Sequence, residues 1–283
     1  MDFNILDAIT KRTSIRSFSM DPIPRETKQK LQNFMDGQKI GPFGSNVRFS
    51  LEDLSHLSPL ESKVYGSFSL IRSTGYFIVG AVYSKEYNLE DYGYVLEKII
   101  LYATQLGLGS CWLGAFFNRT AFGQRIQQQE SEIIPAIVMI GNPNQNRSLM
   151  EKSVRLLVKA EKRKPFSSLF FQGDFATPIN CSGKNKYLLA LEMVRKAPSS
   201  INRQPWRIVK DLHSKKFHFY LQHSFREISS PETINMQRID MGIAMAHFFE
   251  SMAQLDYTGT WSINDPDIRL PNKQTQYITT WTS

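Results

Sequence analysis

The feature of this sequence that most restricts its fold is an internal repeat. The segment DYGYVLEKIILYATQLGLGSCW, which starts at residue 91, aligns without gaps with DMGIAMAHFFESMAQLDYTGTW, which starts at residue 240. The offset is 149 residues, and the identical pairs are Asp91/Asp240, Gly93/Gly242, Gln105/Gln254, Leu106/Leu255 and Trp112/Trp261. A fainter match joins GPFGSNVRF, from residue 41, to APSSINRQPW, from residue 197, and keeps Pro42/Pro198 and Asn46/Asn202. Self-similarity of this kind indicates a duplicated structural element.

Both copies of the repeat read as long buried helices. Apolar residues between positions 95 and 106 fall at helical spacing, with Gly107 placed to end the helix, and positions 243–255 repeat the pattern. Short β-rich runs at 76–83, 133–141, 206–209 and 216–221 predict strands. Two further helices, at 25–35 and 187–195, precede the two copies of the fainter motif. The sequence therefore predicts a duplicated α+β fold, with the joint between residues 166 and 183.

Composition excludes several classes of protein. The chain has 283 residues, of which 41% are hydrophobic, and such a chain can bury a core. No apolar stretch approaches the roughly 20 residues of a transmembrane helix, and the N-terminus does not resemble a secretory signal, so we expect a cytoplasmic protein without membrane contact. The two cysteines and the histidines at 213, 218 and 223 show no metal-binding spacing, so no metal is expected.

The net charge of +8 favours anionic partners, and a nucleic acid is one alternative. However, the basic residues are scattered, and their densest run is KAEKRK at 159–164. No zinc finger or RNA-binding aromatic signature accompanies them. We therefore expect no nucleic-acid partner.

Two polar clusters carry chemical information. In KRTSIRSF, at residues 11–18, two arginines four positions apart flank a serine, and guanidinium and hydroxyl groups in this pattern can hold a phosphate. In APSSINRQPW, at residues 197–206, two hydroxyls and two amides share a turn between prolines. These groups could form hydrogen bonds with the edge of a flat heterocycle. The alternative is an ordinary polar turn. Gly107-x-Gly109 ends a helix rather than opening one, which is not the pattern of a dinucleotide-binding fingerprint.

Together, KRTSIRSF with the following DPIP, GLGSCWLGAF at the end of the first long helix, KRKPF and APSSINRQPW resemble the FMN-dependent nitroreductase family. The match is similar to the subgroup in which two nitroreductase-like modules are fused into one chain. The resemblance implies antiparallel-rich central sheets flanked by helices, arranged as a single-chain pseudo-dimer. It places module 1 at residues 1–172 and module 2 at residues 173–283.

The resemblance also implies a cofactor site. The FMN phosphate, ribityl chain and pyrimidine edge would be held by Arg12, Thr13, Ser14 and Arg16, and the phosphate further by Arg163 and Lys164. The turn that a partner subunit supplies in the family would be Pro198, Ser199, Ser200, Asn202 and Gln204. The segment lying along the isoalloxazine would be Trp112, Leu113, Gly114 and Ala115. No protein side chain is expected to act as a catalytic acid or base, because the cofactor carries the redox chemistry.

The implied activity is transfer of electrons from NAD(P)H through FMN to a nitroaromatic, quinone or similar flat acceptor, by a ping-pong mechanism. The alternative is a non-catalytic FMN-binding protein. The first module has Phe43 and Gly44 where the serines of the turn belong, and the second lacks the arginine cluster. We therefore expect one FMN per chain, in a protein for which a monomer suffices and a homodimer is possible.

Overall fold

The structure is a computed structural model that describes residues 4–66, 75–144, 149–183, 185–224 and 234–283. Its α-helices are α1 (Ile5–Lys11), α2 (Arg25–Asp36), α3 (Pro59–Ser62), α4 (Asn88–Gln105), α5 (Arg119–Arg125), α6 (Leu149–Leu157), α7 (Lys186–Lys196) and α8 (Met236–Gln254). Short 3-10 helices are η1 (Lys63–Tyr65), η2 (Phe166–Ser168) and η3 (Ser200–Asn202). The strands are β1 (Val47–Asp53), β2 (Tyr76–Tyr83), β3 (Gly109–Leu113), β4 (Glu132–Ile133), β5 (Ile137–Gly141), β6 (Phe170–Gln172), β7 (Trp206–Lys210), β8 (Lys216–Gln222), β9 (Thr260–Ser262) and β10 (Thr275–Thr282).

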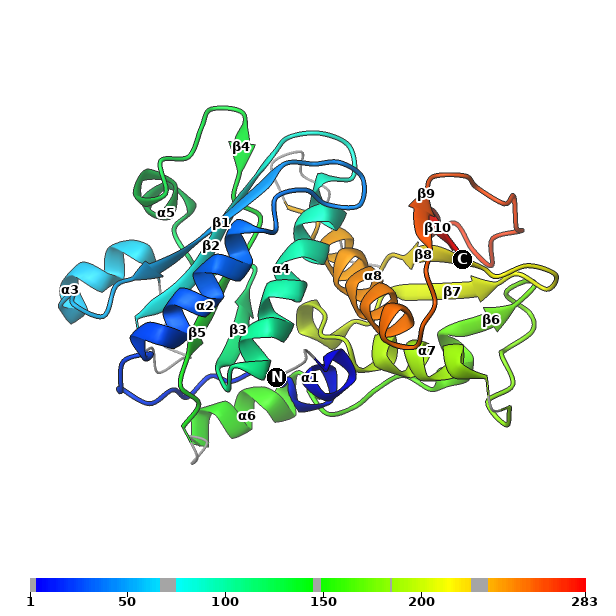
Figure 1. The fold of residues 1–283 in the computed structure, drawn as a ribbon, viewed down its shortest axis with the longest axis horizontal. Coiled ribbons are helices and arrows are strands. Elements are labelled where there is room, and N and C mark those ends of the chain that lie inside the picture. The colour runs from blue at the N-terminus through cyan, green and yellow to red at the C-terminus, as the bar shows by residue number, and fades with distance from the viewer. Residues whose placement is uncertain (1–3, 67–74, 145–148, 184, 225–233) are drawn as a thin grey trace.

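The strands form two sheets with the same order (Figure 1). In the first sheet the order is β1-β2-β5-β3, with β4 added beside β2, and in the second it is β7-β8-β10-β9. All of these pairings are antiparallel. The second sheet has one further strand, β6, which pairs in parallel with β7. The expected duplicated α+β fold with antiparallel-rich sheets is therefore confirmed.

Helices α4 and α8, the two copies of the repeat, lie side by side between the sheets (Figure 1). Their closest approach is at the paired glycines. A Cβ on Gly93 would meet the Ile239 backbone of α8, and a Cβ on Gly242 would meet the Glu90 backbone of α4. Residues 90 and 239 are themselves 149 positions apart, so the packing has the pseudo-two-fold symmetry of the repeat. Apolar residues from both halves merge here into one core.

The sequence explains where α4 begins and ends. Glu90 and Asp91 lie in its first turn, where carboxylates interact favourably with the helix dipole. Gly107 follows the helix with a φ of +83°, which glycine adopts easily, and Leu108 N donates to Ala103 O at 3.0 Å. This is the Schellman pattern that typically terminates helices. The polypeptide is thereby turned directly into β3.

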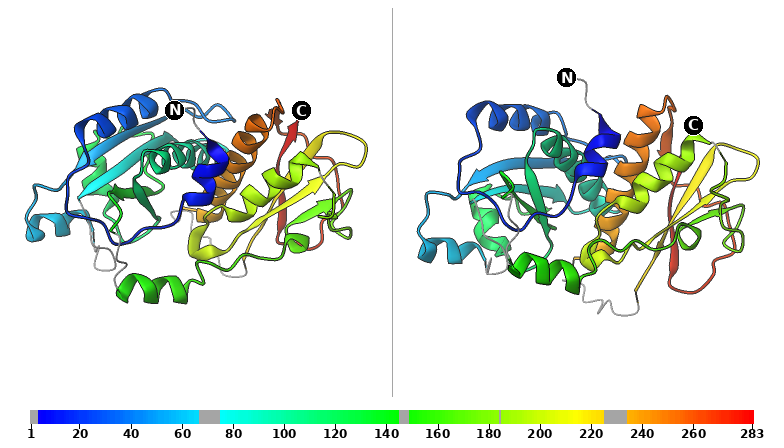
Figure 2. Two further views of the ribbon diagram at one scale, coloured as in Figure 1. Left: turned by 60° about the horizontal axis from the view of Figure 1, so that its bottom comes forward. Right: turned by 90° about the horizontal axis from the view of Figure 1, so that it is seen from below.

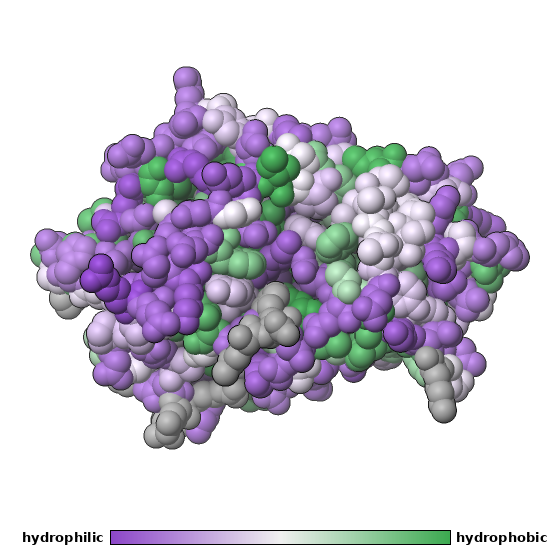
Figure 3. Space-filling model, in the orientation of Figure 1, coloured by the Kyte–Doolittle hydropathy of each residue, from purple (hydrophilic) through white to green (hydrophobic). Residues whose placement is uncertain are grey.

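The remaining helices cover the sheets and link the halves. Helix α2 packs on β1 and α4, while α7 packs on α8. Helix α1 contacts α4, α7 and α8, and so crosses the junction of the two halves (Figure 2). No helix in the described ranges is long and apolar enough to cross a membrane. The face of the molecule shown in Figure 3 is mostly hydrophilic, with its hydrophobic groups in small separate patches.

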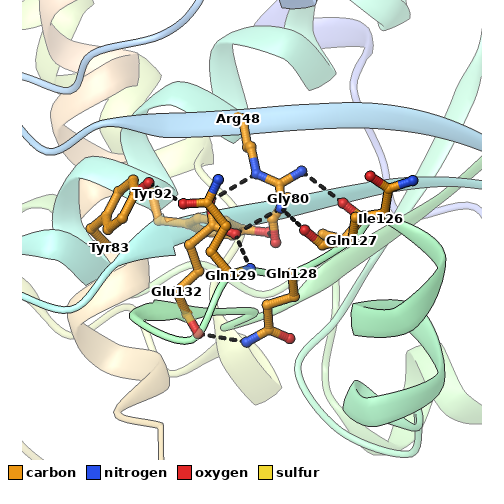
Figure 4. A network of polar contacts seen from close by, with 9 residues as sticks. All are labelled: Arg48, Gly80, Tyr83, Tyr92, Ile126, Gln127, Gln128, Gln129 and Glu132. Atoms are coloured by element: carbon orange, nitrogen blue, oxygen red, sulfur yellow. Dashed lines mark hydrogen bonds and ion pairs between the residues drawn. The ribbon is translucent and has the colours of Figure 1, made fainter.

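Edge strand β1 is fastened by an ion pair between the half-exposed Arg48 and the buried Glu132 (Figure 4). Arg48 donates through Nε and Nη2 to the two carboxylate oxygens of Glu132, at 2.8 and 2.7 Å, and through Nη1 to Ile126 O at 2.9 Å. Hydrogen bonding from Arg48 lowers the pKa of Glu132. Such bidentate pairs are the strong ones. These bonds tie β1 to the first residue of β4 and to the chain before it.

Candidate functional site

A cavity of about 650 Å³ opens between the two halves, a size typical of small-molecule sites. Four segments line it: the chain after α1, the end of β3, the strap of residues 158–163 after α6, and the turn around η3. All but two of the residues predicted for the site lie on its wall, namely Arg12, Thr13, Ser14, Arg16, Trp112, Leu113, Gly114, Ala115, Arg163, Pro198, Ser199, Ser200 and Asn202. Positions almost 190 residues apart in the sequence are thus brought together.

The arginine cluster is presented by an extended segment. Ser14 forms a parallel bridge with Ser110, and Ile15 N donates to Ser110 O at 2.9 Å, which fixes the segment against β3. Successive side chains of an extended chain point to opposite sides. Arg12, Ser14 and Arg16 can therefore share one side, which faces the cavity.

The cavity has an excess of positive charge. Its described lining includes Lys11, Arg12, Arg16, Arg155 and Arg163, whereas its carboxylate is Glu161, which is 80% exposed. Burial lowers the pKa of Arg12, and the neighbouring charges of Arg155 and Arg16 lower it further. Burial likewise lowers the pKa of Arg163, with Arg12 adding to the effect.

Three guanidinium nitrogens on this wall are buried without a hydrogen-bond partner among the described residues. They are Nε of Arg12, Nη1 of Arg16 and Nε of Arg163. Leaving a buried donor unpaired costs about 1–3 kcal/mol, and more for a charged group. A phosphate near Arg12 and Arg163 and a polar ligand atom near Arg16 would supply the missing acceptors, so the donor set fits a phosphorylated cofactor.

A buried polar cluster lies beneath Arg12. Glu97, on α4, forms an ion pair with Arg12 at 3.9 Å and accepts from Trp112 Nε1 at 2.9 Å. Trp112 bonds to Oε2, whereas Oε1, the oxygen nearer Arg12, is 2.9 Å from His247 Nε2, on α8, and His247 Nδ1 is 2.9 Å from Met193 O. Because a carbonyl only accepts, Nδ1 carries a hydrogen. The cluster joins the two central helices to two residues of the cavity wall.

Arg155, on α6, is a wall residue that the sequence reading missed. Its Nη1 donates to Thr13 Oγ1 at 3.0 Å and to Ser14 O at 3.4 Å, and its Nη2 lies 3.1 Å from Glu161. It therefore fastens α6 to the arginine segment while adding charge to the cavity. In the sequence it stands among several lysines and arginines of an amphipathic segment, and nothing distinguishes it from them.

The turn from the second half is strained and tightly held. Ile201, Asn202 and Gln204 have φ values of 49°, 56° and 49°, in the left-handed region that β-branched residues such as Ile rarely adopt. Ser200 N donates to Asp240 Oδ1 at 2.9 Å, which anchors the turn on α8. Strain of this kind persists only where the surroundings enforce it, and it gathers at functional sites.

Asn202 holds the strap in place. Its Nδ2 donates to Lys159 O at 2.7 Å and to Lys162 O at 2.9 Å, and its Oδ1 accepts from Arg163 Nη1 at 3.4 Å. The amide was expected to read the cofactor edge, but here its polar atoms are engaged by the protein. Asn202 thus positions Arg163 on the cavity wall.

Lys164 and Gln204 are the two predicted residues that the structure does not place on this wall. Lys164 N donates to Gln204 Oε1 at 2.8 Å, and both residues line a second cavity behind the strap. Gln204 Nε2 donates to Asn202 Oδ1 at 3.1 Å. It therefore supports the turn from behind, because the backbone reversal after Asn202 carries its side chain away from the first cavity.

Gly114 leaves room for a neighbouring side chain beside the cavity. A Cβ at this position would lie 2.8 Å from Met236 Sδ, so the glycine admits a side chain from α8 of the other half. Arg119 Nη2 donates to Gly114 O at 3.1 Å and so fixes the orientation of this peptide. Met236, like Arg155, lines the cavity and was not expected from the sequence.

The first half has a turn equivalent to that around η3, with different side chains. Asp91, the repeat partner of Asp240, accepts from Phe43 N and Ser45 N at 2.8 Å each. The Phe43 ring packs against Tyr87, with centroids 4.9 Å apart. The anchoring aspartate is therefore kept in both copies, whereas Phe43 and Gly44 provide no hydroxyl.

Three solved structures are among those similar to this chain. A structure from Thermotoga maritima MSB8, described as a "putative nitroreductase", covers 98% of this chain and 92% of its own, with 20% identity and a TM-score of 0.59. A nitroreductase family protein from Clostridium difficile 630 covers 59% of this chain and 96% of its own, with 17% identity and a TM-score of 0.41. A nitroreductase with bound FMN from Desulfitobacterium hafniense DCB-2 covers 52% and 92%, with 18% identity and a TM-score of 0.41. No curated protein matches.

The Thermotoga structure confirms the fold along nearly the whole chain. A sequence model of the family described as "Putative TM nitroreductase" matches residues 4–252, which is most of the chain. The protein therefore belongs to this nitroreductase family.

Proposed function

We propose that the chain is an FMN-dependent oxidoreductase that takes electrons from NAD(P)H and passes them to a nitroaromatic, a quinone or a similar flat acceptor. The observation that carries the proposal is the set of buried guanidinium nitrogens of Arg12, Arg16 and Arg163 that have no hydrogen-bond partner among the described residues, around one cavity between the halves. Membership of the nitroreductase family and the FMN named for a family structure support the same cofactor.

The phosphate would be held at the strap end of the cavity, by Arg12, Arg163 and Arg155. Arg16 and Ser14 would face the ribityl chain and the pyrimidine edge. Residues 112–115 would lie along the ring system. There the Gly114 peptide is already fixed in orientation by its hydrogen bond from Arg119. When bound, FMN would supply the electron transfer itself, while these residues bind and orient it.

The same contacts explain how both halves would contribute to one site. The arginine cluster and β3 come from the proposed module 1, residues 1–172, and the η3 turn comes from the proposed module 2, residues 173–283. Covalent linkage keeps the two parts at an effective concentration of about millimolar. A monomer then suffices for binding, and one complete site per chain is proposed.

The absorption spectrum of the purified protein tests cofactor binding. Bound FMN gives a yellow protein, and its extraction with a protein assay gives the stoichiometry. Anaerobic addition of NADH or NADPH then tests the reaction, since the proposal requires the flavin absorbance to bleach. A chain that holds FMN that neither nucleotide bleaches would instead be a non-catalytic FMN-binding protein, and a colourless chain that binds no added FMN would refute the proposal.

A further inference from the structure

A second cavity, of about 700 Å³, adjoins the first. The wall between them is formed by residues that line both, namely Val158, Arg163, Ile201 and Asn202. The proposed FMN site does not use this space. The second cavity is nevertheless lined by Lys164 and Gln204, which belong to the KRKPF and APSSINRQPW motifs.

The second cavity is strongly basic. Its lining includes six cationic side chains, those of Lys159, Lys162, Arg163, Lys164, Arg203 and Arg207, and no aspartate or glutamate among the residues that the structure describes. None of the six forms an ion pair within the described ranges. Within the part of the chain that the structure describes, these charges have no ion-pair partner.

Backbone carbonyls hold the two innermost cations in place. Lys164 Nζ donates to Gln204 O at 3.2 Å, and Arg207 Nη1 donates to the same oxygen at 3.2 Å. Burial, together with the neighbouring charges of Arg207 and Arg203, lowers the pKa of Lys164 to about 8, and burial lowers the pKa of Arg207 to about 10. A multiply charged anion would relieve this repulsion.

The uncharged part of the wall suits a nucleotide. It includes the carboxamides of Gln222, Asn272 and Gln274. Carboxamides both donate and accept hydrogen bonds, so they can meet sugar hydroxyls and base edges. Arginine and lysine in turn match phosphate oxygens.

We propose that this cavity binds the 2′-phosphate of the reduced nicotinamide dinucleotide and so selects NADPH over NADH. The inference rests on the proposed function, because a dinucleotide that reaches the first cavity with its nicotinamide has the second cavity beside it. The two nucleotides differ only in the 2′-phosphate. Six cations without an ion-pair partner among the described residues favour the ligand with the greater negative charge.

Adenosine 2′,5′-bisphosphate is the probe, since it carries the 2′-phosphate without the nicotinamide. Calorimetric titration of the FMN-loaded protein should show it binding at least tenfold more tightly than AMP. The variant combines Lys162→Gln with Arg203→Gln, two exposed side chains of the second cavity. The control combines Arg25→Gln with Lys39→Gln, which are also exposed and lose the same charge elsewhere.

We expect the variant to bind the bisphosphate at least tenfold more weakly and the control to stay within twofold of the wild type. In steady-state kinetics, kcat/KM for NADPH should fall at least tenfold in the variant, while that for NADH changes less than threefold. Undiminished bisphosphate binding in the variant would overturn the inference. So would a single-stranded RNA oligonucleotide that binds more tightly than the bisphosphate and displaces it.

The FMN content of the same samples keeps this inference separate from the proposed function. A yellow protein that NADH and NADPH reduce equally well refutes the selective site and leaves the FMN enzyme intact. A protein that binds the bisphosphate but no FMN refutes the proposed function while retaining the anion site.

Discussion

Replacing Gly242 by alanine tests whether the paired glycines set the distance between the central helices. The added Cβ would lie 2.7 Å from Tyr94 N and 2.8 Å from Glu90 C, with the Glu90 carbonyl oxygen nearer still. Ordinary contacts begin at 3.4 Å, so the shortfall from Tyr94 N alone is about 0.7 Å. The obstructing atoms are backbone and cannot rotate away. Helix α8 must therefore move from α4.

The expected loss of stability follows from two opposing terms. Alanine in place of glycine inside a helix gains about 1 kcal/mol. Overpacking typically costs about 1–3 kcal/mol, and rigid backbone contacts place this site at or above the upper end. The net loss should be about 2 kcal/mol, which corresponds to a melting temperature roughly 5 °C lower. The displacement would also strain the hydrogen bond between Glu97 and His247, which spans the same two helices.

Thermal unfolding followed by circular dichroism measures this loss, with Gly37→Ala as the matched control. Gly37 caps α2 with a φ of −81°, and a Cβ there would meet only Phe34 O at 3.5 Å and Asn33 O at 3.9 Å. The control should melt within about 2 °C of the wild type, because unstrained surface changes stay within roughly 0.5 kcal/mol. If Gly242→Ala melted together with Gly37→Ala, the helices would not be in the close contact described.

Three further predictions concern the cofactor. Arg12→Ala should weaken the binding of FMN by about tenfold or more and that of riboflavin far less, since a hydrogen bond to a charged group contributes about 1.5–3 kcal/mol. Fluorescence titration with both ligands measures the two affinities. Equal losses of affinity would mean that Arg12 supports the ring or the fold. Ser199→Ala combined with Asn202→Ala should release most FMN without changing the far-ultraviolet circular dichroism, because the strap loses its anchor, and an unchanged FMN content would remove the turn from the site. Flavin extraction with a solution mass measurement should give one FMN per chain in a protein able to be monomeric, whereas two FMN would show that the turn at Phe43 and Gly44 still binds.

The sequence predicted most accurately those elements in which a regular pattern of apolar residues continues over many positions and most side chains are buried. The helix expected around residues 95–106 and its partner at 243–255 are α4 and α8, each of which begins seven residues earlier than expected. The predicted strand at 76–83 is β2, and its bounds are those expected. These elements bury nearly every side chain, so their apolar pattern has few exceptions. The predicted helices at 25–35 and 187–195 are α2 and α7.

Short strands and distant partners were not predictable in the same way. Strand β6 has three residues, too few to show a period. The segment GLGSCW was taken only as the end of a helix, yet its last residues form β3, whose sheet partner β5 lies about 25 residues further on. His247 looks like a core residue from its helical face, and its bond to Glu97 joins positions 150 apart, which the 149-residue repeat does not relate. Arg155 was missed because only the fold distinguishes it from other basic residues.

Strand β6 has a consequence for the order in which the protein can be made. It follows the strap that carries Arg163, and its partner β7 begins at Trp206, more than 30 residues later in the chain. At about 5–20 residues per second, the ribosome needs a few seconds to add them. During that interval β6 lacks its sheet partner. The strap also lacks the turn that holds it through Asn202. Cofactor loading should therefore follow translation of both halves, rather than accompany the folding of the first.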